Sequence, residues 1–170
     1  TAVKLPVYYR VLNAGFRSAV TASTDAYIDQ GRMHPGAART YAYAPSLTWS
    51  EIADAHRKGA TFATNGPLVW LSVNGKRPGE EARVARNGSA EVQFRAASNR
   101  GLTRAEVIVN GRIAYTAFPG ADGEIRGSFV LPVSESCWVA LRAFGPRGEG
   151  LADELIPDEW KAEGIGQFAH

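Results

Sequence analysis

The chain has 170 residues, 45% of them hydrophobic, which is enough for a buried core and for one domain with a short addition. Its 19 basic and 17 acidic residues are interspersed and leave a net charge of +2, so no nucleic-acid partner is expected. Cys137 is the single cysteine, which excludes an internal disulfide, and its apolar surroundings predict a buried structural residue. No apolar run reaches the length of a membrane span, so no membrane partner is expected. Nothing in the sequence marks a cellular compartment.

The first sixty residues show the patterns of alternating helix and strand. Apolar residues at helical spacing predict a helix over Leu5–Asn13, with Gly15 as its stop. Small and β-branched residues predict a short buried strand over Ser18–Ala22, and glycines and prolines predict a loop over Asp29–Ala38. Thr48 and Glu51 form a capping-box pattern before a helix over Trp49–Lys58. Gly59 would end that helix, and its inner stripe holds Ile52, Ala55 and His56.

From Ala60 onward the hydrophobic period changes to two, which indicates strands. Two Asn-Gly pairs, Asn74-Gly75 and Asn110-Gly111, suit type I′ turns, and each is predicted to close a two-residue hairpin. We expect an immunoglobulin-like β-sandwich from about Thr61 to Phe144. Its strands are predicted at residues 68–73, 90–97, 105–109, 112–118, 124–133 and 137–144. The irregular segment Pro157–His170 predicts a sandwich that stops before its last strand and leaves an open edge.

Two residues are candidates for binding a divalent metal. Asp25 follows the predicted strand at Ser18–Ala22, and the ends of barrel strands commonly carry catalytic groups. The alternative for Asp25 is a turn or helix cap. His34 lies in a loop rich in glycine and proline, from which it could reach the same place, or it is a solvated loop histidine. His56 is expected to pack in its helix, and His170 cannot be assigned a role.

The chain lacks the motifs of a self-sufficient catalytic site. It has no His-x-His, His-Glu-x-x-His, paired-cysteine, Gly-x-Ser-x-Gly or Walker pattern. A catalytic metal needs three or more protein ligands, so the chain alone is expected to be inactive.

Three segments together resemble a known family. Tyr8–Arg17, Ala22–Ala26 and Gly59–Pro67 look like the C-terminal part of CehA/McbA-type metallohydrolases, in the PHP (polymerase and histidinol phosphatase) superfamily. The resemblance covers roughly residues 5–80 and continues more faintly through residues 110–111 and 138–142. It implies a distorted (β/α)₇ barrel with zinc, manganese or iron at its mouth, which hydrolyses phosphate esters or, in some members, aryl carbamates.

The family's metal residues can be compared position by position. Asp25 matches the aspartate of the late Asp-x-His motif, Tyr27 stands where many members have the histidine, and His34 is a substitute ligand. The early His-x-His ligands would lie upstream of Thr1. The resemblance therefore implies a mostly β chain with an α/β N-terminal part. Residues 1–64 would be a barrel remnant, and residues 65–170 an immunoglobulin-like sandwich that lacks its last strand.

The expected function is that of the C-terminal part of a metal-dependent hydrolase. Water activated by the metal would attack a small phosphate ester, ester or carbamate. The alternative is a non-catalytic β-sandwich binding module, with Trp70 and Trp160 as carbohydrate-contacting or simply strand-packing aromatics. Self-association is also expected, through the open sheet edge or an apolar face. This face comprises Leu5, Leu12, Phe16, Val20 and Ile52. It is expected to pack on a second copy of the chain or on the sandwich, or else the segment is expected to be poorly ordered.

Overall fold

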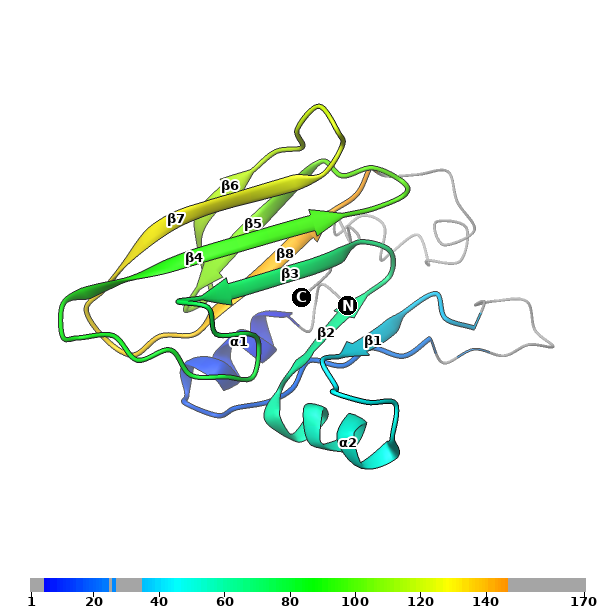
Figure 1. Ribbon diagram of the computed structural model, residues 1–170, viewed down its shortest axis with the longest axis horizontal. Helices are drawn as coiled ribbons and strands as arrows, with labels where there is room; N and C mark the ends of the chain where they lie inside the picture. Colours follow the sequence, from blue (N-terminus) through cyan, green and yellow to red (C-terminus); the bar gives the residue numbers. More distant parts are fainter. Residues whose placement is uncertain (1–4, 25, 27–34, 147–170) are drawn as a thin grey trace.

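The computed structural model describes residues 5–24, 26 and 35–146, and these are mostly β with antiparallel sheets (Figure 1). Two helices and eight strands are found in these residues. In chain order they are α1 (Leu5–Asn13), β1 (Arg39–Ala42), α2 (Trp49–Lys58), β2 (Thr61–Thr64), β3 (Leu68–Val73), β4 (Gly88–Ala97), β5 (Arg104–Val109), β6 (Arg112–Ala117), β7 (Ile125–Val133) and β8 (Val139–Phe144).

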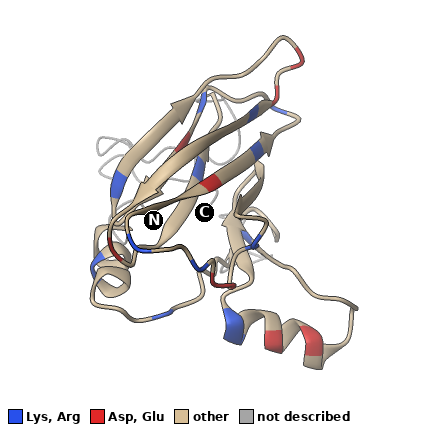
Figure 2. Cartoon of the chain, turned by 60° about the vertical axis from the view of Figure 1, so that its left-hand side comes forward, with Lys and Arg blue, Asp and Glu red and all other residues tan. Residues whose placement is uncertain are grey.

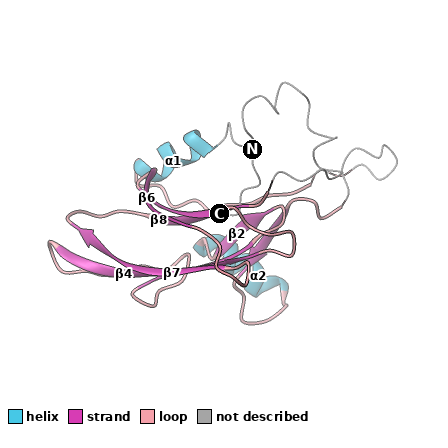
Figure 3. Cartoon of the chain, turned by 90° about the horizontal axis from the view of Figure 1, so that it is seen from above, coloured by secondary structure: helices cyan, strands magenta, loops and turns pink. Residues whose placement is uncertain are grey.

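Six of the strands form two three-stranded sheets that lie face to face as a β-sandwich. One sheet has the order β3-β4-β7 and the other β6-β5-β8, and Figure 3 shows them as two layers. Along β4, buried side chains that face the other sheet alternate with exposed side chains on the outer face. The core between them includes Val69, Val92, Phe94, Ala96, Val107, Ile125, Leu131 and Leu141. All six strands predicted after Pro67 are confirmed, with shifts of one or two residues at their ends.

The two Asn-Gly turns differ in what they connect. Asn110-Gly111 joins β5 to β6 as a two-residue hairpin, with φ of 49° and 84°, as predicted. Asn74-Gly75 also makes a turn with positive φ, and Val73 and Lys76 exchange hydrogen bonds of 2.9 Å across it. The predicted two-residue turn is therefore present, but no second strand follows it directly, because β3 pairs with β4, which begins only at Gly88.

The sequence after Lys76 explains why that hairpin stops. Pro78 has no backbone N–H to donate to a ladder. Gly79 has a φ of 86° and lies against the end of α2, where an added Cβ would come within 2.6 Å of the Lys58 carbonyl oxygen. The connection between β3 and β4 therefore packs on the first part of the chain.

Helix α2 has the ends that its sequence predicts. The Thr48 hydroxyl accepts a hydrogen bond from the Glu51 amide at 3.4 Å, and Gly59 ends the helix with a left-handed φ of 74°. Ala55 is buried on the inner stripe, and Ile52 and His56 are half-buried.

Strands β1 and β2 form a separate antiparallel pair, and β1 was not predicted. All four residues of β2 are buried, since both faces of this strand are covered. Phe62 joins the sandwich core on one face. On the other, the Thr61 hydroxyl donates to the Val20 carbonyl at 2.9 Å, and the Thr40 hydroxyl bonds both the amide and the carbonyl of Ala22 at 2.8 and 2.9 Å.

The prediction of a strand over Ser18–Ala22 is wrong, because this segment pairs with no neighbouring strand. Threonine hydroxyls from β1 and β2, and not the backbone of a neighbouring strand, bind the polar groups of Val20 and Ala22. The segment consequently lies over the face of the β1–β2 pair without a ladder of its own.

Helix α1 covers the outer face of the β6-β5-β8 sheet (Figure 3). The ring of Tyr9 lies 5.0 Å from that of Trp138, and the Trp138 indole N–H donates to the Asn13 side-chain oxygen at 2.7 Å. The predicted apolar face is only partly covered. Leu5 is buried and Phe16 is 68% exposed, whereas Leu12, Val20 and Ile52 are half-buried.

Neither described helix is long and apolar enough to cross a membrane.

The predicted boundary between residues 64 and 65 falls at the turn between β2 and β3. The Thr64 hydroxyl organises this turn, because it donates to the Pro67 carbonyl at 2.5 Å and accepts from the Gly66 amide at 2.9 Å.

Gly127 provides a test of the sandwich packing. A Cβ at this position would lie 2.5 Å from the Phe94 ring, which occupies the space beside it on the inner face. Gly127→Ala is expected to destabilise the fold by about 1–3 kcal/mol through overpacking, measured by urea unfolding. Ser128→Ala, at an exposed position next along β7, is the control and should change stability by less than about 0.5 kcal/mol. Equal stability of the two variants would contradict this packing.

Candidate functional site

The predicted metal residues Asp25 and His34 lie outside the described residues, as do Tyr27, Trp160 and His170. The structure describes the chain up to Thr24, directly before Asp25. Thr24 is 8% exposed, and its hydroxyl donates to the Ala38 carbonyl at 3.0 Å and accepts from the Ala38 amide at 3.1 Å. The residue before Asp25 is therefore held next to the residue before β1.

The described ranges contain no group of three or more His, Cys, Asp or Glu residues that could hold a metal ion. His56 packs in α2, where its Nδ1 lies 2.9 Å from the Ile52 carbonyl, as expected for a structural histidine. Cys137 is exposed, so the prediction of a buried cysteine is wrong. The reason is that β8 begins only at Val139 and Cys137 lies in the preceding loop.

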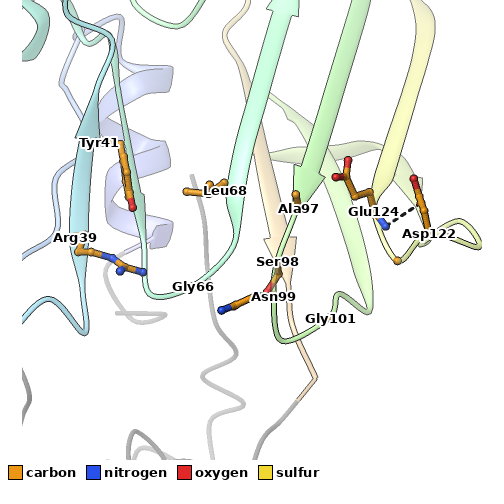
Figure 4. A pocket seen from close by; sticks show the side chains of 11 residues that line it. Arg39, Tyr41, Gly66, Leu68, Ala97, Ser98, Asn99, Gly101, Asp122 and Glu124 are labelled. Atoms are coloured by element: carbon orange, nitrogen blue, oxygen red, sulfur yellow. Dashed lines mark hydrogen bonds between the residues drawn. The ribbon is translucent and has the colours of Figure 1, made fainter.

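An open pocket of about 490 Å³ lies at one end of the sandwich (Figure 4). Four parts of the chain surround it: β1, the turn that leads into β3, the end of β4 with the loop after it, and the turn before β7. Its volume is within the range of small-molecule sites. Its lining comprises Arg39, Tyr41, Gly66, Leu68, Ala97, Ser98, Asn99, Gly101, Asp122, Gly123 and Glu124.

One wall of the pocket is basic and aromatic. Arg39 and Tyr41 are two residues apart on β1 and therefore share a face, with the Arg39 guanidinium carbon 6.0 Å from the centre of the Tyr41 ring. Tyr41 stacks on Phe62 of β2 at 5.0 Å with an interplanar angle of 4°, and Phe62 belongs to the core. The core thus fixes the position of this wall.

The opposite wall carries two carboxylates that already have partners. Glu124 accepts a two-pronged pair of hydrogen bonds from Arg95 at 2.7 and 2.8 Å, and Asp122 accepts from Arg126 at 2.6 Å. Arg126 also contacts Glu124 at 2.7 Å. Arg126 lowers the pKa of Asp122 and Arg95 lowers the pKa of Glu124, mainly through these hydrogen bonds. Both carboxylates are ionised at neutral pH, and the positive charges of Arg95 and Arg126 balance them.

This network also reaches the exposed Trp70. The Arg95 guanidinium carbon lies 4.6 Å from the centre of the Trp70 ring, so Trp70 packs across the strands of its sheet and is 37% exposed. Figure 2 shows that basic and acidic residues both occur on the sandwich and on α2.

A second polar cluster lies beneath α1 on the outer face of the β6-β5-β8 sheet. Glu106 is 4% exposed and accepts hydrogen bonds from Arg104 at 2.7 Å and from Arg142. Arg142 also lies 3.5 Å from the Tyr9 hydroxyl, and its Nε is buried without a partner among the described residues. Burial alone would raise the pKa of Glu106, but the two arginines outweigh it and the pKa is lowered.

Perturbed carboxyls often mark functional sites, but Glu106 does not line the pocket and is enclosed by two arginines and a helix. We interpret this cluster as the polar contact that fixes α1 to the sheet.

Three residues that line the pocket were not predicted from the sequence: Arg39, Tyr41 and Asn99. The alternation of Arg39-Thr40-Tyr41-Ala42 carries a weak strand signal, with Arg39 and Tyr41 on one face. A four-residue strand between glycine-rich and proline-rich segments gives too short a pattern to identify, and no local signal brings Asn99 to the same place.

Comparisons with models of protein families, with curated proteins and with solved structures found no match to this chain.

The buried Glu106 cluster generates a prediction on stability and pH. Glu106→Gln would leave Arg142 covered without its carboxylate, so we expect destabilisation by about 3 kcal/mol at pH 7 in urea unfolding. Because the folded pKa of Glu106 is lowered, its contribution is complete above the unfolded pKa of about 4.3 and is lost as pH falls through the folded pKa. The difference between the two proteins should accordingly shrink in acid.

The matched control is Glu135→Gln, at an exposed loop position. Its free energy of unfolding should equal that of the native chain both at pH 7 and in acid. An equal effect of the two substitutions would show that Glu106 has no special role.

Proposed function

We propose that this chain corresponds to the C-terminal part of a PHP-type metal-dependent hydrolase that acts on a small phosphate ester, ester or carbamate. In this proposal the barrel domain ends within residues 1–64, and the sandwich is an immunoglobulin-like domain that follows it. The described residues offer no complete set of metal ligands, so we assign no catalytic step to them.

The observation that carries the proposal is the anchoring of Thr24. A metal ligand must be held within a fraction of an ångström of its working position. Two hydrogen bonds to Ala38 fix Thr24, the buried residue next to Asp25, and hydroxyls of Thr40 and Thr61 fix the residues before it.

The orientation of β1 and β2 limits which residues belong to the barrel. Neighbouring strands of a (β/α) barrel run parallel, whereas β1 and β2 are antiparallel. We therefore assign the barrel role to the segment from α1 to Thr24 and treat the β1–β2 pair as a connection between the barrel and the sandwich.

The second candidate is a non-catalytic binding module. It is favoured by the way α1 packs on the sandwich through Tyr9, Asn13 and Trp138, which makes the N-terminal residues part of one body with it. Self-association through the edge strands of the two sheets stays a prediction under either candidate.

The two candidates predict different sequences upstream of this segment in its reading frame. A His-x-His motif within an alternating helix and strand pattern upstream would support the hydrolase. For a protein that carries it, Asp25→Asn should reduce both bound metal and kcat/KM by at least about 100-fold, measured by metal analysis and a phosphate-ester assay. Ser46→Ala, on an exposed loop, is the control. Full metal content and activity in the Asp25 variant would exclude the proposed role.

The 170-residue chain itself allows a simpler measurement. Because Asp25 and His34 are the only two ligands that we predict and a catalytic site needs three or more, titration with zinc or manganese should show no tight stoichiometric site, and no ester should be hydrolysed. One tightly bound metal per chain, lost in Asp25→Ala, would show that the chain forms its own site.

A further inference from the structure

We propose that the pocket between β1 and the loop after β4 binds a small organic oxyanion, with Arg39 as its principal partner. Arg39 is exposed and lines the pocket, and no ion pair to it is found among the described residues. A guanidinium is the side chain best suited to a carboxylate or phosphate, because it offers parallel N–H donors in one plane.

The charge around the pocket favours an anion beside Arg39. On the far wall, Asp122 and Glu124 are matched by Arg126 and Arg95. Three arginines against two carboxylates leave one positive charge, and it is located at Arg39. The acidic wall is across the pocket from Arg39, so an anion at Arg39 need not approach it (Figure 4).

Further donors converge on the same place. In Figure 4 the Arg39 and Asn99 side chains point toward each other from the two sides of the Gly66 turn. The Ser98 hydroxyl lines the pocket as well. It accepts a hydrogen bond from the Arg100 amide at 3.2 Å, which leaves its own proton to donate. A guanidinium, a carboxamide and a hydroxyl form a set of neutral and positive donors that matches an oxyanion.

The same pocket offers a surface for the organic part of such a ligand. Tyr41 is 40% exposed and is held by its stacking on Phe62, and Leu68 lines the pocket beside it. An aryl or alkyl group attached to the oxyanion would contact these side chains. The site therefore favours an organic phosphate or carboxylate over the bare inorganic ion.

The pocket is linked to the anchored end of the segment before Asp25. Arg39 follows Ala38, and Ala38 exchanges two hydrogen bonds with Thr24. If the ligand is the anionic group of a hydrolase substrate, that identification rests on the proposed function. The binding of the oxyanion rests only on the pocket and its donors.

The test uses the 170-residue chain without added metal, titrated with phenyl phosphate and followed by the amide resonances of a ¹H–¹⁵N spectrum. Saturable shifts are expected at Gly66, Asn99 and Gly101, with weak affinity in the millimolar range. Loss of a charge-assisted contact worth about 1.5 kcal/mol or more predicts at least about tenfold weaker binding in Arg39→Gln. Asn99→Ala should weaken binding less. Phenol, which lacks the oxyanion, should cause no saturable shift at these amides.

The matched control is Arg86→Gln, which removes the same charge from an exposed loop outside the pocket. It should bind phenyl phosphate as the native chain does, and the spectra will show that both variants are folded. Equal affinity of Arg39→Gln and the native chain, or saturable binding of phenol, would overturn the proposal. Because metal is absent, failure here leaves the proposed hydrolase untouched, and failure of the metal experiments leaves this site untouched.

Discussion

Threonine hydroxyls hold the first part of the chain to the rest of the structure. Thr24, Thr40 and Thr61 bind backbone groups that no strand pairs, and each buried polar group must find a partner. A valine has the same shape but no donor or acceptor, so valines at these positions would leave backbone groups of Val20, Ala22 and Ala38 unsatisfied. The position of the segment before Asp25 depends on these few hydroxyls.

Aromatic contacts join the β1–β2 pair to the sandwich. Phe62 belongs to the common core and stacks on Tyr41, which in turn forms a wall of the pocket. Tyr43 adds a direct link, since its ring lies 6.0 Å from that of Phe62 and its hydroxyl donates to the Val69 carbonyl at 3.2 Å. The pocket consequently has one wall built on β1 and the others built on the sandwich.

The sequence predicted the sandwich well because its signals are local. Period-two patterns located β3 to β8, and Asn110-Gly111 has the residues that a hairpin with positive φ requires. The errors come from tertiary context. Ser18–Ala22 has the composition of a strand, but its partners are side chains. Asn74-Gly75 makes its turn, but Pro78 and the approach of Gly79 to α2 divert the chain.

The pocket was beyond sequence reasoning for a similar reason. Arg39 and Asn99 are sixty residues apart in the sequence. They line the same pocket because β1 pairs with β2, β2 leads directly into β3, and β3 pairs with β4, which Asn99 follows. Their residue types are common on protein surfaces, so neither indicates a site by itself. Asp25 and His34 lie outside the described residues, and their assignment stays a prediction from the sequence.

The double burial of β2 has a consequence for cooperativity. One face of this strand contributes to the sandwich core through Phe62, and on the other face the Thr61 hydroxyl binds the Val20 carbonyl. Detachment of either layer would expose one face of the same four residues to water. The two parts of the chain are thus expected to unfold in a single transition, and a cut between residues 64 and 65 would not release two independently folding units.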